Sequence, residues 1–86
     1  MISEKKIKEK DYKTMIEMKS GIKYNVVGFK ASDKLVRRFF ALGIRKGTSI
    51  TFIKFSYLSH NLMINVDGVV YAIKSNLASL ILVKEA

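Results

Sequence analysis

The amino-acid sequence predicts a mainly β protein: a small closed or nearly closed barrel of about five short strands, with one short α-helix between the first and second strands. Three observations support this fold class. Apolar residues alternate with a period of two in several short runs that end at glycine or polar residues. Residues 32–43 instead place apolar residues at helical spacing. The 86 residues have room for one domain, and closing a barrel removes strand edges that would otherwise aggregate.

The composition excludes several classes of function. The chain contains no cysteine, which excludes a disulfide framework, a thiolate metal site and a thiol nucleophile. Its single histidine argues against a histidine metal cluster and against a Ser-His-Asp triad. Sixteen lysine and arginine residues against seven aspartate and glutamate residues give a net charge of +9, which indicates an anionic partner.

The apolar runs of the sequence are too short for a membrane-spanning helix. The longest, such as Val69–Ile73, have the length of a strand, whereas a membrane-spanning helix needs roughly 18 to 20 apolar residues. No apolar stretch follows the N-terminal lysines, so we expect no secretory signal and a cytoplasmic protein, placed at most peripherally at the inner face of the membrane.

The charge divides the chain into two parts. Residues 1–13 hold five lysines and three acidic residues with few apolar ones, so we expect a flexible basic N-terminal tail. This tail holds +2 of the net charge of +9, which leaves +7 for residues 14–86. Residues 14–86 are expected to form the barrel domain.

The first strand is expected over residues 22–29. Alternation places Tyr24 and Val26 on one face, and Asn25, Val27 and Phe29 on the other. Gly28 indicates a bulge or a close approach of another backbone. The helix follows, with Ser32 or Asp33 as its N-cap. Its apolar face is formed by Leu35, Phe39 and Leu42. Gly43 ends the helix, and Ile44 is expected to contact Phe39 as in a Schellman motif.

Strands are expected to follow the helix. Residues 50–55 alternate, with Ile50, Phe52 and Lys54 on one face and Thr51, Ile53 and Phe55 on the other. The dipeptide Asp67-Gly68 between two apolar runs predicts a type I′ hairpin turn. The predicted register pairs Val66 with Val69, Ile64 with Tyr71 and Leu62 with Ile73. One helical turn over residues 75–80 and a short strand over residues 81–83 complete the barrel.

An ordered set of motifs runs along most of the chain. It includes the pair Arg37-Arg38, the dipeptide Leu42-Gly43 and, four residues later, Gly47 ahead of a strand. Gly21 before the first strand, Asp67-Gly68 and the closing segment 72–83 fall into the same register. In this order and at these spacings, residues from about Met15 to Val83 resemble the FeoA family.

The resemblance implies a fold and a role. The fold would be an SH3-like β-barrel, in the cytoplasm of a bacterium or archaeon. The role would be that of an accessory to the ferrous-iron transporter FeoB, a membrane permease with a cytosolic GTP-binding domain, and so in iron homeostasis. Similar domains form the C-terminal part of iron-dependent DtxR-type repressors, so the fold alone does not decide the role.

Five cationic residues gather on the helix and on the turn after it. They are Lys34, Arg37, Arg38, Arg45 and Lys46. They could be only the solvated face of a helix. They could also form a docking surface for an acidic protein face or for anionic lipid headgroups beside the transporter. We take them as the candidate partner-binding residues, together with the loop over residues 56–61.

Two other functions remain open. A nucleic-acid-binding barrel would place these cations on phosphates, and its log affinity would fall with log salt at a slope of about −4 to −5. A stacking platform could then be formed by Phe39, Phe40, Phe52, Phe55 and Tyr71, although Phe39, Phe52 and Tyr71 fit core positions. Self-association through exposed strand edges or the tail is the third possibility.

No pattern indicates catalysis, a metal site or a cofactor. His60 stands alone in a polar loop, where one imidazole gives weak metal affinity. The glycines lack the spacing and the lysine of a phosphate-binding loop. Beyond the tail, the acidic residues are Glu17, Asp33, Asp67 and Glu85, and no nucleophile stands near a base. We therefore expect a non-enzymatic interaction module.

Overall fold

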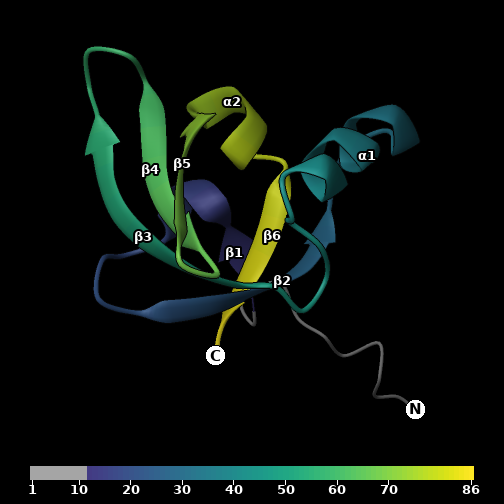
Figure 1. The fold of residues 1–86 in the computed structure, drawn as a ribbon, viewed down its shortest axis with the longest axis horizontal. Helices are drawn as coiled ribbons and strands as arrows, with labels where there is room; N and C mark the ends of the chain where they lie inside the picture. The colour runs from purple at the N-terminus through teal and green to yellow at the C-terminus, as the bar shows by residue number, and fades with distance from the viewer. Residues whose placement is uncertain (1–11) are drawn as a thin grey trace.

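The computed structural model describes residues 12–86 (Figure 1). Its elements, in chain order, are β1 (Lys13–Thr14), the 3₁₀ helix η3 (Met15–Glu17), β2 (Lys23–Phe29), α1 (Asp33–Ala41), β3 (Ser49–Ser56), β4 (Asn61–Val66), β5 (Val69–Lys74), α2 (Ser75–Ala78) and β6 (Ile81–Glu85). The strands form one curled sheet in the order β1-β6-β2-β3-β4-β5, in which all neighbours are antiparallel. The expected tail falls almost entirely on residues outside this description.

The mainly β class is confirmed, with six strands rather than about five. The additional strand, β1, is only two residues long and pairs Lys13 with Val83 and Thr14 with Leu82. Two residues are too few to show a periodicity in the sequence. Only the pairing with β6 identifies β1 as a strand. With β1 counted, the helix α1 lies between β2 and β3.

The barrel is not fully closed. A parallel bridge joins Ser20 to Phe52, and the two ends of the sheet are β1 and β5. Within residues 12–86, β5 pairs with β4 and with no strand on its other side. In Figure 1, α2 covers one end of the sheet, and α1 lies on the opposite side of the molecule from the β3–β4 turn.

The core collects side chains from strands β2 to β6 and from η3, α1 and α2. Its buried members are Met15, Met18, Tyr24, Val26, Phe39, Ile44, Ile50, Leu62, Ile64, Val66, Ile73, Ala78, Ile81 and Val83. Tyr24 is buried completely, and its hydroxyl oxygen accepts a hydrogen bond from the Lys19 amide at 3.0 Å. The buried hydroxyl group of Tyr24 therefore has a hydrogen-bond partner, as buried polar groups generally do.

The β4–β5 hairpin has the predicted register. Val66 pairs with Val69, Ile64 with Tyr71 and Leu62 with Ile73. Asp67 and Gly68 have φ values of 57° and 89°. Two consecutive positive φ values are what a type I′ turn requires, and they match the right-handed twist of the flanking strands.

A bulge in β2 corrects the predicted face of Phe29. The pairing with β6 shifts between Val26 and Gly28, so Phe29 comes to lie opposite the buried Ile81. Its ring stacks on that of Phe39, with centroids 5.5 Å apart and an interplanar angle of 13°. Simple alternation placed Phe29 on the face opposite Tyr24. The extra residue of the bulge reverses that assignment.

A second bulge corrects the predicted faces of β3. The register with β4 shifts between Phe52 and Lys54, and Phe55 pairs with the buried Leu62. Phe52 and Phe55 both pack against the core, while Lys54 is exposed. The prediction grouped Lys54 with Phe52, because it counted residues without the one that the bulge adds.

Helix α1 begins and ends as the sequence predicts. The Ser32 hydroxyl oxygen accepts a hydrogen bond from the Leu35 amide at 3.3 Å. At the other end, the Gly43 amide donates to the Phe40 carbonyl and the Ile44 amide donates to the Phe39 carbonyl. These two bonds are those of a Schellman motif. They direct Ile44 into the core and start the turn that carries Arg45.

Candidate functional site

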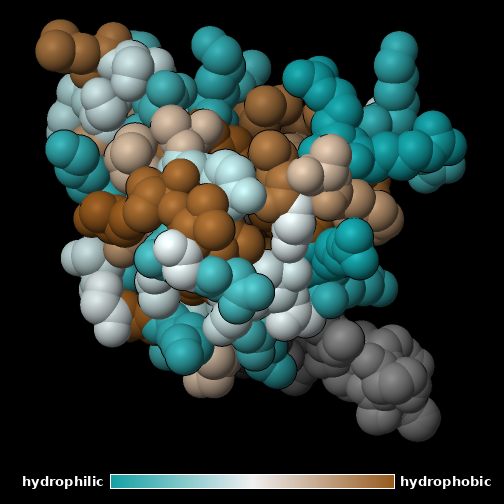
Figure 2. Space-filling view, in the orientation of Figure 1, coloured by the Kyte–Doolittle hydropathy of each residue, from teal (hydrophilic) through white to brown (hydrophobic). Residues whose placement is uncertain are grey.

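The five predicted cations lie on the surface of α1 and of the turn after it. Lys34, Arg37, Arg38, Arg45 and Lys46 are all exposed. The first three are spaced at i, i+3 and i+4, which puts them on one side of the helix. Figure 2 shows hydrophilic side chains projecting from the α1 side of the molecule. We call these five residues the basic patch.

Arg45 is held against the helix. Its guanidinium carbon lies 5.7 Å from the centroid of the Phe40 ring, a cation–π distance. Its backbone amide donates to the Thr48 hydroxyl at 3.0 Å, which orders the turn. Phe40 is 41% exposed and stands about one helical turn from Arg37. The fold thus brings the cation of the turn to the cations of the helix.

A groove runs between α1, β5 and α2. It has a volume of about 300 Å³ and is mainly apolar. Its lining residues are Leu35, Arg38, Phe39, Leu42, Ala72, Ile73, Lys74 and Leu77. The charged residues among them, Arg38 and Lys74, are both cationic. We call this feature the α1–β5 groove; through Arg38 it is continuous with the basic patch.

Sequence reasoning did not find the α1–β5 groove. It assigned Leu35, Phe39 and Leu42 to one apolar face of the helix. In the structure Phe39 is buried, whereas Leu35 is half-buried and Leu42 is 38% exposed. The sequence did show that the apolar face of the helix is broad. It did not show that β5 lies beside this face.

The β3–β4 turn presents two apolar side chains to solvent. Tyr57 is 82% exposed and Leu58 is 99% exposed. The Tyr57 ring makes an edge contact with Phe55 at 4.9 Å between centroids. Exposed aromatic and aliphatic residues at the tip of a loop are typical of contact surfaces. This turn lies within the loop over residues 56–61 that the sequence analysis singled out.

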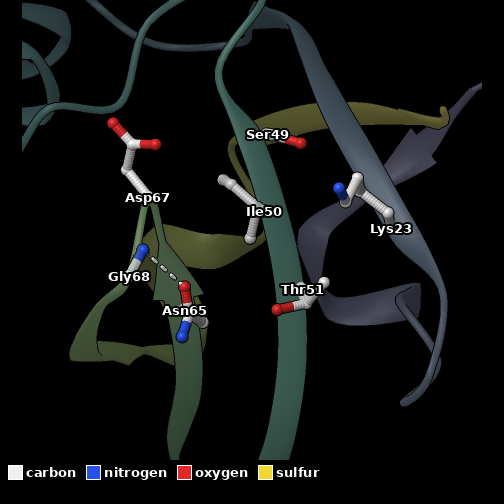
Figure 3. A pocket seen from close by; sticks show the side chains of 7 residues that line it. All are labelled: Lys23, Ser49, Ile50, Thr51, Asn65, Asp67 and Gly68. Carbon is white, nitrogen blue, oxygen red and sulfur yellow. Dashed lines mark hydrogen bonds between the residues drawn. The ribbon is translucent and has the colours of Figure 1, made fainter.

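A second groove, of about 320 Å³, is polar and lies along β3 (Figure 3). Its lining residues are Lys23, Ser49, Ile50, Thr51, Asn65, Asp67 and Gly68. Figure 3 shows Asp67 and Lys23 on opposite sides of β3. The Asn65 side-chain oxygen accepts a hydrogen bond from the Gly68 backbone amide at 2.8 Å. The Asn65 side chain therefore stabilises the hairpin turn.

The described residues hold no cluster suited to a metal ion. Within residues 12–86 no group of three or more histidine, cysteine, aspartate or glutamate side chains comes together. His60 lies in the exposed β3–β4 turn, with its ring 6.3 Å from that of Phe55. In the same part of the chain, none of the helices has the length and apolar content needed to cross a membrane.

Comparison with protein families identifies the chain. A family model described as the FeoA domain matches residues 13–85. The chain belongs to the FeoA family. This match covers nearly all residues that the structure describes, and it includes the basic patch and the α1–β5 groove. A search of curated proteins finds no match.

Solved structures support the same assignment. A crystal structure described as the iron uptake regulatory protein FeoA is 25% identical over 87% of this chain and 99% of that chain, with a TM-score of 0.78. FeoA from Chlorobium tepidum is 25% identical over 84% of this chain and 69% of that one, with a TM-score of 0.74. The chain therefore has the SH3-like fold of an iron-transport family.

Metal-dependent repressors share this fold. The manganese-activated repressor ScaR, in its apo form, is similar with a TM-score of 0.77 and 23% identity. The similarity covers 86% of this chain but 35% of the repressor chain. It therefore shows a common domain architecture within a longer protein, and not a common activity.

Proposed function

We propose that this FeoA-family chain is a small, non-catalytic accessory protein of ferrous-iron uptake, which binds the cytosolic part of a FeoB-type transporter. The observation that carries the proposal is the basic patch, placed on a chain whose family is linked to iron transport. The basic patch would contact an acidic surface of the transporter. The site of action would be the cytoplasm, close to the inner face of the membrane.

The fold does not depend on the basic patch. Among the residues described, the core contains no buried polar or charged side chain, and all five patch residues are exposed. The Arg45 guanidinium nevertheless packs on the Phe40 ring, and the Arg45 backbone amide donates to the Thr48 hydroxyl. A cation that is already ordered loses less entropy on binding, which favours a docking role over a solvated surface.

Apolar contact area accompanies the cations. Phe40 is 41% exposed beside Arg45, and Leu42 is exposed at the end of α1. Aromatic residues and arginine are the residue types enriched in protein interfaces. The exposed Tyr57 and Leu58 of the β3–β4 turn would supply a second contact.

The acidic residues support a non-catalytic role, because three of them have local structural positions. The Glu17 carboxylate accepts from the Thr14 amide at 2.7 Å, Asp67 occupies the hairpin turn and Asp33 lies in the first turn of α1. Acid–base or nucleophilic chemistry needs paired groups within hydrogen-bond reach.

The test is direct binding of the full chain to the cytosolic domain of the FeoB-type transporter encoded in the same genome. The double variant Arg37→Glu, Arg38→Glu reverses charge within the patch. The matched control, Lys23→Glu with Lys84→Glu, makes the same change in net charge at two exposed lysines of β2 and β6. We expect the patch variant to weaken binding about tenfold or more and the control to weaken it far less.

Each other outcome has a definite meaning. If the unmodified chain does not bind the cytosolic domain, the proposed function is wrong. If both double variants weaken binding equally, only the overall charge matters, and the assignment to the basic patch is wrong.

Nucleic-acid binding is the alternative function, since the same cations could contact phosphates. The structure gives little support for the aromatic stacking platform that this alternative would use. Phe39 is buried, and Phe52 and Tyr71 pack against the core. Three of the candidate aromatic residues are therefore not free to stack on bases.

A further inference from the structure

The outer edge of β5 carries unpaired backbone groups. Val66 and Val69 flank the two-residue turn and form a hydrogen-bonded pair, as in other hairpins of this type. Hydrogen-bonded pairs alternate along an antiparallel ladder, so Val70 and Ala72 direct their N–H and C=O groups away from β4. No strand described in residues 12–86 pairs with that edge. Four backbone hydrogen-bonding groups therefore face outward from two alternate residues.

The same edge borders the α1–β5 groove. Ala72, Ile73 and Lys74 of β5 line the groove on one side. Leu35 and Leu42 of α1 line it on the other. The free edge of β5 thus lies across an apolar groove from α1. Exposed hydrophobic side chains gather over β3 to β5 in Figure 2. Addition of a strand at such an edge combines main-chain hydrogen bonds with side-chain pockets.

We propose that the α1–β5 groove binds an extended segment of a partner protein, which adds to β5 as an antiparallel strand. The segment has apolar side chains at alternate positions and acidic side chains between them. The inference deepens the proposed function, and it rests on that function only for the identity of the partner as the transporter.

The alternation of side chains follows from the pairing. Partner residues opposite Val70 and Ala72 would make the hydrogen bonds, and their side chains would lie on the outer face of the sheet. Partner residues opposite Tyr71 and Ile73 would direct their side chains toward the groove. The groove surface there is formed by Ile73, Phe39 and Leu77. Apolar side chains therefore fit the second set of positions.

Acidic side chains fit the first set of positions. Lys74 lies on the same face of β5 as Val70 and Ala72, because alternate residues of a strand share a face. The charged residues that line the α1–β5 groove are Arg38 and Lys74, and no acidic residue lines it. A second copy of this chain, with a net charge of +9, would be repelled by the same cations. An acidic segment of another protein fits the groove better than self-association through β5.

Hydrogen exchange of the full chain tests the binding mode. In the free chain we expect fast exchange of the Val70 and Ala72 amides, since neither is paired, and slow exchange of the Ile64 and Tyr71 amides of the β4–β5 ladder. The cytosolic domain of the FeoB-type transporter should slow exchange at Val70 and Ala72 at least tenfold. Slow exchange of these two amides in the free chain would show that the edge is already covered, and would overturn the inference.

Substitutions of Ala72 test the contribution of the β5 edge to binding separately from that of the groove. Ala72→Pro removes an N–H that points away from β4, a position at which an edge strand tolerates proline. Ala72→Val keeps the N–H and the preference for a strand. We expect the proline variant to weaken partner binding about tenfold relative to the valine variant. Equal binding by two folded variants would contradict strand addition.

A synthetic peptide makes the test independent of Ala72→Pro folding. The probe is an octapeptide in which glutamate alternates with valine or leucine, and its charge control carries lysine in place of glutamate. N-methylation of the glutamate nitrogens should abolish binding, because these residues pair with Val70 and Ala72. N-methylation of the valine and leucine nitrogens should weaken binding less than threefold, since those nitrogens point away from β5.

The outcomes distinguish this inference from the proposed function. If the transporter domain binds without protecting Val70 and Ala72, the inference is wrong and the proposed function stands. If the transporter domain does not bind but the octapeptide protects both amides, the proposed function is wrong and the groove still binds acidic segments. If neither ligand protects these amides, or the lysine peptide binds as tightly, the groove is not the site inferred.

Discussion

The Ile44 amide donates a hydrogen bond to the Phe39 carbonyl at 3.0 Å, and both side chains are buried in the core. Together with the bond from the Gly43 amide to the Phe40 carbonyl, it joins the end of α1 to the start of the turn that carries Arg45. Gly43 lies between the two segments with a φ of 86°, in the left-handed region. The position of the basic patch thus depends on a residue that can adopt positive φ at little cost.

Replacement of Gly43 tests this dependence. Gly43→Ala should lower the free energy of unfolding by about 1–2 kcal/mol, because a Cβ is strained at positive φ. An added Cβ would meet no atom within 4 Å, so the backbone conformation is the only cause of strain. The control is Gly28→Ala, whose Cβ would make an ordinary contact of 3.8 Å with Leu82. Urea denaturation measures both, and equal losses would contradict the argument.

The two neighbouring phenylalanines of α1 should differ strongly. Phe39→Ala removes a buried ring that stacks on Phe29 and should lower the free energy of unfolding by about 3–5 kcal/mol. Phe40→Ala, at a ring that is 41% exposed, should cost much less. If Phe39→Ala does not fold, Phe39→Leu should show a smaller loss in the same direction. Similar denaturation midpoints for Phe39→Leu and Phe40→Leu would contradict the burial of Phe39 in the core.

The β4–β5 turn depends on one side-chain hydrogen bond. Asn65→Ala removes the acceptor for the Gly68 amide, at 2.8 Å, and should destabilise the chain by about 0.5–1.5 kcal/mol. Asn65→Asp keeps an acceptor and should retain most of the stability. Thermal denaturation of the three proteins measures the difference. No loss in the alanine variant would mean that solvent replaces this bond without cost.

His60 should contribute nothing to iron binding. Its backbone has a φ of 57°, its amide donates to the Ser56 carbonyl at 2.8 Å and its carbonyl accepts from the Ser75 amide at 2.9 Å. His60→Asn is the suitable variant, since asparagine tolerates positive φ. Anaerobic titration with ferrous iron should give the same result for both proteins. Loss of a stoichiometric site in the variant would make His60 a metal ligand.

Binding to nucleic acid should be absent or only weakly salt-dependent. Contact of all five patch cations with phosphates would give a slope of log affinity against log salt of about −4 to −5. A mobility-shift or anisotropy titration of duplex DNA and of RNA at several salt concentrations measures this slope. A steep slope that Arg37→Glu with Arg38→Glu flattens would favour the nucleic-acid alternative over the transporter.

Local sequence patterns predicted the parts of the fold that depend on a few neighbouring residues. Asp67-Gly68 favours positive φ at both turn positions, and the register of the hairpin follows from the turn. The Ser32 cap and the Gly43 end of α1 are also short-range features. Such signals need no knowledge of the remaining chain.

The errors of the sequence prediction have one cause. Phe29 and Phe55 were assigned to the wrong faces because a bulge adds a residue to β2 and another to β3. Gly28 indicated the bulge in β2, but which residue it adds, and so which face each side chain takes, becomes visible only when the strand is paired with its neighbour. The strand β1 was missed for the same reason, since two residues become a strand only beside β6.

The sequence by itself determined a thiol-free, strongly basic, mainly β domain of the FeoA type, with five of its cations on one helix and the turn after it. Tertiary structure alone decided that Arg45 packs on Phe40 beside that helix, that β5 keeps a free edge and that Leu35 faces Ile73 across a groove. Periodicity and turn chemistry act over a few residues. A groove or a free edge depends on which distant segments pack together, and no short stretch of sequence contains that information.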